Sequence, residues 1–183
     1  MKGRILSIDI GEKHLGYTTL DLETMEFNSG IYTVLEKRGS NIVLERVSSL
    51  HKFINEVAVN GLYAAVIERQ VVGNEIAMEL MYSLVSLIMP YTNRICIFDP
   101  KRKFTTINQP YITTGKKHKK LSIENMRKII ATNKFPSFAK LSSILESEPK
   151  KDDIADSFNQ LLIYLIDLKI DCFSIDEIKS LVL

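Results

Sequence analysis

The sequence contains little cysteine and no long apolar run, and both absences narrow the classes of protein it can be. Its two cysteines, Cys96 and Cys172, lack metal-site spacing and stand among apolar residues. We therefore expect buried thiols in a reducing compartment. The apolar stretches are too short or too interrupted by charge to span a membrane, and the N-terminus leads into a strand pattern without signal-peptide features. These features predict an intracellular protein without a membrane anchor.

Internal repeats and low-complexity linkers are also missing. A chain of 183 residues, 45% apolar and 25% charged, has the composition of an ordinary globular protein. That length suits one hydrophobic core better than two. We therefore predict a single domain over residues 1–183.

Acidic residues are absent from residues 101–120, although the net charge of the chain is only +2. A concentrated basic patch attracts a phosphate backbone, whereas many basic runs are only solvated loops. Because the segment also contains Pro110 and Gly115, we predict a mobile loop. Its basic residues are Lys101, Arg102, Lys103, Lys116, Lys117, Lys119 and Lys120.

Apolar periodicity predicts an α/β chain. Short apolar runs predict strands at residues 4–11, 14–22, 29–35, 63–68 and 94–98, with the first three in an antiparallel meander. Helical spacing predicts helices at residues 41–59, 74–89, 121–132, 138–146 and 150–168, with Asn41 as a candidate cap. The helix at 74–89 is apolar over much of its circumference, so it is either enclosed by the core or shared with another chain.

Two carboxylates interrupt these apolar patterns. Asp9 lies inside the first strand, and Glu68 ends the strand at residues 63–68. Burying an unpaired carboxylate is costly, so a cation holds Asp9, or the residue is exposed and caps the turn through Gly11.

The helix at residues 150–168 begins with three further acids, Asp152, Asp153 and Asp156. Helix capping explains one or two of them, but neighbouring acids repel one another unless a cation lies between them. Together with Asp9 and Glu68 they supply the oxygen ligands that Mg²⁺ or Mn²⁺ takes. Two such ions can activate a water and stabilise a leaving oxygen in phosphodiester cleavage. Beside a basic segment, this set predicts a nuclease.

The motifs at residues 7–11 (SIDIG), 66–70 (VIERQ) and 150–157 (KKDDIADS), with the order of the elements, resemble the RuvC branch of the RNase H-like superfamily. In particular they resemble the poxvirus Holliday junction resolvases. The resemblance covers residues 2–170 and leaves the tail at 174–183 unassigned. It implies an α/β, RNase H-like fold with a mixed five-stranded sheet flanked by helices. It also implies a metal-dependent endonuclease that resolves four-way DNA junctions by symmetric nicking, in viral DNA recombination and concatemer processing.

The same resemblance implies roles for individual residues. The metal-binding and catalytic carboxylates would be Asp9, Glu68, Asp153 and Asp156, holding two Mg²⁺ ions that Mn²⁺ can replace, with Asp152 as the alternative to Asp153. Lys120 would assist at the scissile phosphate, with Lys119 as the alternative, although a generic phosphate contact also explains either lysine. The DNA-binding residues would be Arg69, Lys101, Arg102, Lys103, Lys116, Lys117 and Lys119.

Symmetric cuts on two strands need two active sites, which a twofold homodimer provides. The helix at residues 74–89 is the candidate interface. The resemblance also implies a location in the host cytoplasm.

One position departs from the family pattern. Bacterial members carry an aromatic residue three positions after the strand glutamate, where this chain has Val71, followed by Val72. Stacking on a base is therefore not available there. Tyr111, Phe104 or Arg69 could substitute, and each also fits an ordinary core or loop role.

Two other functions remain open from the sequence. A nuclease of the same superfamily could act on RNA in RNA–DNA hybrids. A non-catalytic member of the fold could bind ATP or nucleic acid, since Asp-x-Gly strands also occur in sugar-kinase and actin-like chains. Against the latter, the sequence has no second Gly-rich phosphate-binding loop.

Overall fold

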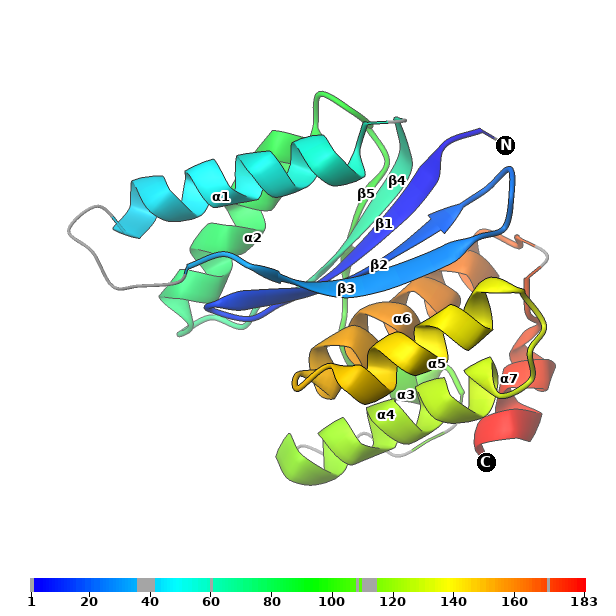
Figure 1. Cartoon of the computed structure of the whole chain (residues 1–183). Helices are drawn as coiled ribbons and strands as arrows, with labels where there is room; N and C mark the ends of the chain where they lie inside the picture. Colours follow the sequence, from blue (N-terminus) through cyan, green and yellow to red (C-terminus); the bar gives the residue numbers. More distant parts are fainter. Residues whose placement is uncertain (1, 36–41, 60, 108, 110–114, 171) are drawn as a thin grey trace.

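A mixed sheet of five strands organises the fold (Figure 1). The computed structural model describes residues 2–35, 42–59, 61–107, 109, 115–170 and 172–183. The strands are β1 (Arg4–Ile10), β2 (His14–Asp21), β3 (Phe27–Thr33), β4 (Leu62–Glu68) and β5 (Ile95–Phe98), in the spatial order β3-β2-β1-β4-β5. As predicted, the first three strands form an antiparallel meander.

Strand β1 pairs in parallel with β4, and β4 pairs in parallel with β5. The carboxyl ends of parallel neighbours meet at one edge of a sheet, where α/β proteins place their ligands. Ile8 pairs with Ile67, so the next residues, Asp9 and Glu68, come out at the same edge. The sheet therefore brings together two acids that are far apart in the sequence.

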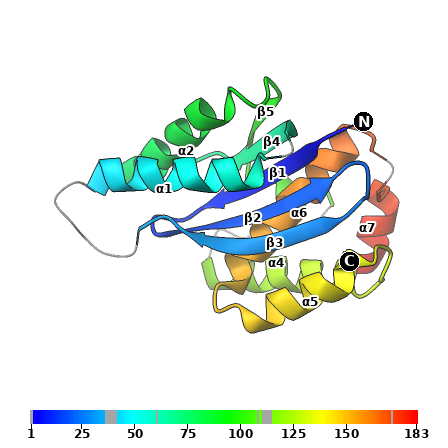
Figure 2. The same ribbon diagram turned by 45° about the horizontal axis from the view of Figure 1, so that its top comes forward.

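Helices cover both faces of the sheet (Figures 1 and 2). One face carries α1 (Ile42–Val57) and α2 (Glu75–Ile88), and the other carries α6 (Lys151–Asp167) with α4 (Gly115–Ile130), α5 (Ser137–Ser147) and α7 (Ile175–Val182) around it. A one-turn helix, α3 (Arg102–Thr105), follows β5 and packs against α6. Two buried clusters result, one on each face.

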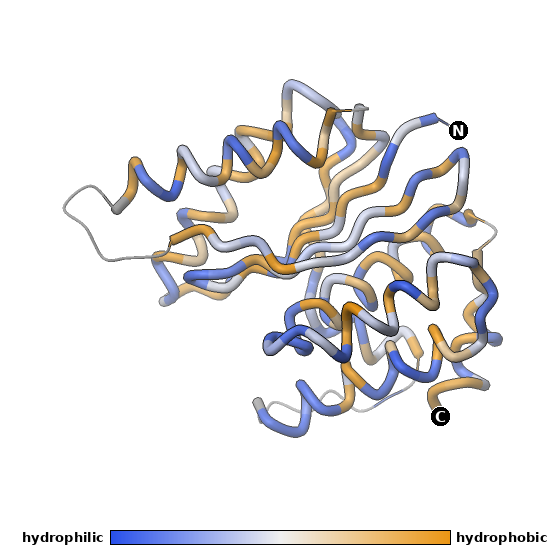
Figure 3. The backbone as a smooth tube through the Cα atoms, viewed as in Figure 1, coloured by the Kyte–Doolittle hydropathy of each residue, from blue (hydrophilic) through white to orange (hydrophobic). Residues whose placement is uncertain are grey.

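Because side chains alternate along β1, the two faces of the sheet receive different residues from this strand. Leu6 and Ile8 belong to the cluster under α1 and α2, while Ile5 belongs to the cluster under α6. Ser7 and Asp9 share the face of Ile5, so the polar residues of β1 lie toward α6. Figure 3 shows the same division, with apolar residues concentrated in the strands and hydrophilic residues at the start of α4.

The predicted loop at residues 101–120 is wrong where the structure describes it. Residues 102–105 form α3, and α4 already begins at Gly115, so Lys116 to Lys120 are helical. The buried face of α4 starts with polar residues, Ser122 and Asn125, before Met126. The apolar period therefore becomes visible only after the helix has begun. Residues 108 and 110–114 lie outside the described residues, as does the predicted cap Asn41.

The unassigned tail forms α7. Ser174 and Glu177 form a capping box at its start, and Ile178 and Val182 are buried in the cluster under α6. The side chains of Gln109 and Lys128 both donate to the carbonyl of Val182. The tail is thus an integral part of that core.

Helix α2 is covered on one face only. Leu80, Leu84 and Ile88 are buried, whereas Tyr82 in the middle of the helix and Met89 just after it are exposed. The side chain of Cys96 is half-buried and that of Cys172 is buried. No helix in the described part of the chain is both long enough and apolar enough to cross a membrane.

Candidate active site

Asp9 and Glu68 lie beside each other at the carboxyl edge of β1 and β4. Burial raises the pKa of Asp9 well above its usual range; the charges of Glu68 and Asp156 add to this effect and that of Lys103 opposes it. The edge of the sheet is therefore a site that favours an added cation.

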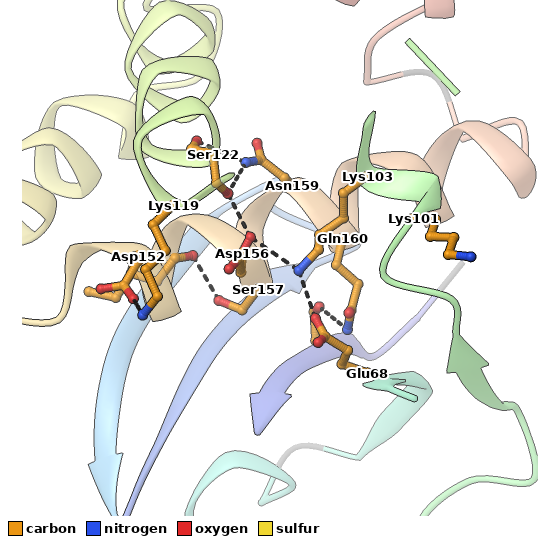
Figure 4. A network of polar contacts seen from close by, with 12 residues as sticks. Glu68, Lys101, Lys103, Lys119, Ser122, Asp152, Asp156, Ser157, Asn159 and Gln160 are labelled. Carbon is orange, nitrogen blue, oxygen red and sulfur yellow. Dashed lines mark hydrogen bonds and ion pairs between the residues drawn. The ribbon is translucent and has the colours of Figure 1, made fainter. Parts of the chain in front are cut away.

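A buried lysine already supplies one positive charge there. The side chain of Lys103, on α3, is only 1% exposed, and its Nζ lies 2.7 Å from Oε2 of Glu68 and 3.1 Å from Oδ1 of Asp156 (Figure 4). Burial opposes the charge, but Asp156 and Glu68 outweigh it and raise the pKa of Lys103. Acids from β4 and α6 are thus joined through one ammonium group.

Helix α4 orients Asp156. The hydroxyl of Ser122 donates to Oδ1 of Asp156 at 2.7 Å, and Nδ2 of Asn159 contacts the Ser122 Oγ at 2.9 Å and the Ser122 carbonyl at 3.0 Å. All three residues are buried. The carboxylate of Asp156 is therefore fixed by two partners, Ser122 and Lys103.

Asp152 and Asp153 occupy different surroundings at the start of α6. Burial opposes ionisation of Asp152, but its ion pair with Lys119 outweighs burial and lowers the pKa of Asp152. Burial and then the charge of Asp152 raise the pKa of Asp153 to about 6. Asp153 lines a surface pocket with residues of the β1–β2 turn, namely Gly11, Glu12, Lys13 and His14, together with Lys150.

Gly16 allows the start of α6 to approach the sheet beside Asp9. It pairs with Asp9 across β1 and β2, and a Cβ at this position would lie 2.1 Å from the carbonyl oxygen of Asp153. No side chain fits at that distance. The backbone of Asp153 therefore packs directly over the residue that faces Asp9.

A layer of polar side chains anchors α6 to the strands. Gln160 Nε2 lies within 3.2 Å of the Ser7 hydroxyl and of the carbonyl oxygens of Ile8 and Val66. The hydroxyl of Thr18 bonds to those of Ser29 and Ser157, at 2.8 and 2.9 Å. These bonds fix α6 relative to β1, β2 and β4, and so fix Asp156 relative to Asp9 and Glu68.

Sequence reasoning missed four of these residues as parts of the site. It placed Lys103 among the DNA contacts and did not single out Ser122, Asn159 or Gln160. Asn159 and Gln160 could have been noticed in the sequence, because they are polar residues that interrupt the apolar face of a long helix.

No group of three or more His, Cys, Asp or Glu side chains among the described residues is arranged to hold a metal ion as it stands. Lys103 lies between two of the acids. The donor set nevertheless fits a hard divalent ion, because every donor is a carboxylate oxygen, the acids repel one another, and two of them already bind an ammonium group. Asp9, Glu68 and Asp156 are the residues that could hold it, and Asp153 lies about one turn before Asp156 on α6.

The predicted DNA-binding residues lie in several environments. Lys116, Lys117 and Arg69 are exposed, and Lys120 forms an exposed pair with Glu124 at 3.7 Å. Arg102 makes two bonds of 2.8 Å to the carboxylate of Asp167. Lys101 points away from the network around Lys103 (Figure 4). Of the two lysines considered for the scissile phosphate, the structure places Lys119 beside an acid of α6, and Lys120 beside Glu124.

The residues considered as wedges differ in exposure. Val71 and Val72 are 69% and 92% exposed in the loop after Glu68. Phe104 is fully buried, so its ring is not available to a base. Tyr111 lies outside the described residues.

A model of the family described as poxvirus A22 protein matches residues 4–168. The chain belongs to the poxvirus A22 protein family. A search of curated proteins found no match. The matched segment runs from β1 to the residue after α6 and contains every residue of the site described above.

Solved structures share the fold at low sequence identity. The fowlpox virus Holliday junction resolvase matches with a TM-score of 0.59 and 17% identity, over 90% of this chain and 99% of that one. Thermus thermophilus RuvC in complex with a Holliday junction substrate matches with a TM-score of 0.57 and 15% identity, over 92% and 96% of the two chains. These matches confirm the predicted RNase H-like fold with its mixed five-stranded sheet.

Proposed function

We propose that this chain is a divalent-metal-dependent endonuclease that resolves four-way DNA junctions by symmetric nicking. The observation that carries the proposal is the meeting of Asp9, Glu68 and Asp156 around a cation position, at the sheet edge of a fold shared with two Holliday junction resolvases. Membership of a poxvirus family supports a role in viral DNA recombination and concatemer processing, in the host cytoplasm. Residues 1–183 form a single nuclease domain in this proposal.

The metal ligands in this proposal are Asp9, Glu68, Asp153 and Asp156, which would hold two Mg²⁺ ions, with Mn²⁺ able to substitute. When bound, these ions supply an activated water and stabilise the leaving oxygen. Ser122 holds Asp156 in one orientation, and Gly16 keeps the start of α6 close to Asp9. The chain thus fixes its acids before DNA arrives, which keeps the cost of organising the reaction low.

The DNA contacts in this proposal come from Arg69, Lys101, Arg102 and the basic residues at the start of α4. Lys103, predicted as a DNA contact from the sequence, is not among them, because its side chain is enclosed between Glu68 and Asp156. Lys116 and Lys117 extend from the exposed start of α4 and would bind the phosphate backbone. Lys119 or Lys120 would contact the scissile phosphate. Because nothing in the chain resembles a groove-reading module, specificity would come from branch shape.

A twofold homodimer would place two such sites on one junction. The exposed side chains of Tyr82 and Met89 on α2 suit this interface, because α2 buries only one of its faces in the monomer.

The test is incubation of the purified chain with a synthetic four-way junction, with and without Mg²⁺. The expected result is Mg²⁺-dependent, ligatable nicks on opposing strands. Asp9→Asn is expected to abolish nicking and to retain junction binding, while Asp176→Asn, an exposed acid on α7, is expected to cut normally. An RNA–DNA hybrid is tested alongside, and a preference for the hybrid would overturn the proposal in favour of an RNase H-type activity.

A further inference from the structure

Lys103 is the charged group most completely enclosed by the site. Its side chain is 1% exposed, and its ammonium bridges Glu68 on β4 and Asp156 on α6. A lysine is almost never buried unless it is paired, and here both partners are acids of the proposed metal site. Lys103 therefore occupies the position where a cation between these two acids would lie.

The backbone around Lys103 is anchored on both sides. Arg102 binds the carboxylate of Asp167 through two bonds of 2.8 Å, and Phe104 is fully buried with its ring centroid 4.4 Å from that of His118. One-turn helix α3 is therefore held in place by its neighbours. The four-carbon stem of Lys103 is the part that can change conformation without unfolding α3.

A divalent ion bound by Glu68 and Asp156 would lie next to this ammonium. The double charge of the ion and the single charge of the ammonium would repel each other strongly, because both groups lie in a site that is largely shielded from water. Glu68 and Asp156 cannot bind the ion and the ammonium of Lys103 at full strength at the same time. Binding of the ion and retention of Lys103 in its bridge therefore exclude each other.

We propose that Lys103 is an internal counter-ion, which holds Glu68 and Asp156 together in the metal-free protein and is displaced when a divalent ion binds. The proposal rests on the proposed function, since it assigns these acids to a metal site. It makes Lys103 a positioning residue whose exposure reports whether the site is occupied. In addition, the presence of Lys103 makes the site bind a metal ion more weakly than the same acids would bind it without the lysine.

Chemical labelling of the wild-type protein tests the displacement without any substitution. Lysines are acetylated briefly in the absence of DNA, once in chelator and once in Mg²⁺, and the modified peptides are quantified by mass spectrometry. Lys103 is expected to be protected in chelator and labelled several-fold faster in Mg²⁺. Lys52, exposed on α1 on the opposite face of the sheet, is the internal control and should not change. Unchanged protection of Lys103 at saturating Mg²⁺ overturns the proposal.

A substitution tests the competition. Lys103→Met keeps the apolar stem and removes the charge, so in chelator its melting temperature should fall below that of the wild type. In Mg²⁺ the two temperatures should converge, and calorimetry should show tighter Mg²⁺ binding to the variant, with Lys52→Met behaving as wild type. Weaker Mg²⁺ binding by a folded Lys103→Met protein contradicts the competition. If this variant does not fold, the labelling of the wild type decides whether the proposal holds.

The junction assay separates this inference from the proposed function. If the wild type nicks the junction in Mg²⁺ while Lys103 stays protected, the nuclease function is supported and the counter-ion role of Lys103 is wrong. Absence of both nicking and Mg²⁺ binding removes the metal site itself, and the displacement with it.

Discussion

Asp153 is the one acid at the start of α6 whose ionisation opposes folding. Burial and the neighbouring Asp152 raise its pKa from 3.8 to about 6. A carboxyl group with a raised pKa in the folded state stabilises the fold below the unfolded pKa, and this contribution is lost as the pH rises through the folded value. Ionised Asp153 is therefore a cost to the metal-free protein at neutral pH.

We accordingly expect Asp153→Asn to stabilise the metal-free protein at pH 7 to 8. Because the group is partly exposed, the gain should be about 1–2 kcal/mol. The gain should shrink as the pH falls through about 6 and vanish below 3.8. Urea unfolding in chelator at several pH values measures this directly.

Asp152→Asn is the matched control. Lys119 lowers the pKa of Asp152, so this substitution should destabilise the protein at neutral pH. Equal effects of the two substitutions across the pH range would contradict the assignment of different surroundings to the two acids.

Gly16 is required by a contact between backbones. A methyl group at this position would lie 2.1 Å from the carbonyl oxygen of Asp153. Gly16→Ala should therefore move the start of α6 away from β2, at a cost of about 1–3 kcal/mol in stability. Misplacement of the acids should also reduce junction nicking by about 100-fold. Thermal unfolding and single-turnover nicking measure the two effects.

The comparison variant is Gly61→Ala, where a Cβ would meet nothing within 4 Å, although the residue has a positive φ of 80°. It should lose stability through backbone strain and retain nicking by the folded protein. If Gly16→Ala also keeps normal nicking, the close approach of α6 is not needed for the chemistry.

The acids of the site could be proposed from the sequence because a carboxylate in an apolar strand is conspicuous wherever it occurs. Asp9 and Glu68 are examples, and the structure brings both to one edge of the sheet. Lys103 could not be placed in the same way. A lysine within a basic run looks exposed, and only the packing of α3 against α6 shows that its side chain is enclosed.

Among the elements, α4 combines two faces with different tasks. Ser122 and Asn125 on its inner face hold Asp156 and Gln109, while Lys116 and Lys117 are exposed at its start. The inner face belongs to the site, and the outer lysines suit the DNA backbone.

We expect the double variant Lys116→Gln with Lys117→Gln to bind the junction more weakly at all salt concentrations. If both lysines neutralise phosphates, the slope of log K against log salt should become shallower by about 2. Fluorescence anisotropy titrations over a range of salt concentrations give this slope. Lys52→Gln on α1 is the control, and an unchanged slope in the double variant would exclude this face of α4 from the DNA contact.

The element boundaries show where sequence reasoning succeeds. The strands and the helices α1, α2, α5 and α6 were predicted within a few residues, because apolar residues at strand or helix spacing run through most of their length. Helix α4 was predicted to begin at residue 121, because its buried face begins with polar residues. Helix α7 is short, and its own sequence does not reveal that Ile178 and Val182 pack into the cluster under α6 or that Gln109 and Lys128 bind the carbonyl of Val182.

At the scale of the whole molecule, each protomer carries one set of acids. Residues Asp9, Glu68 and Asp156 all come from one chain and share the face of the sheet under α6. A junction resolved by two opposing cuts therefore requires two chains in the proposed homodimer.

Mixed dimers of wild-type and Asp9→Asn chains should nick one strand and leave the junction unresolved. The two chains can be co-expressed with different tags and purified over both. A cruciform plasmid then reports single nicks as open circles and paired cuts as linear molecules. Mixed dimers of wild-type and Asp176→Asn chains should give linear products, and linear products from the Asp9→Asn mixture would show that one site can cut both strands.

The position of α6 late in the chain has a consequence for synthesis of the protein in a cell. Ribosomes release β1 and β4 well before α6, so a growing polypeptide carries Asp9 and Glu68 without Asp156 or the polar anchors of Gln160. Without α6, the incomplete chain cannot hold Asp9 and Glu68 in the arrangement that the site needs. The proposed cleavage of DNA would therefore not begin until translation has passed α6, the last helix that the site needs.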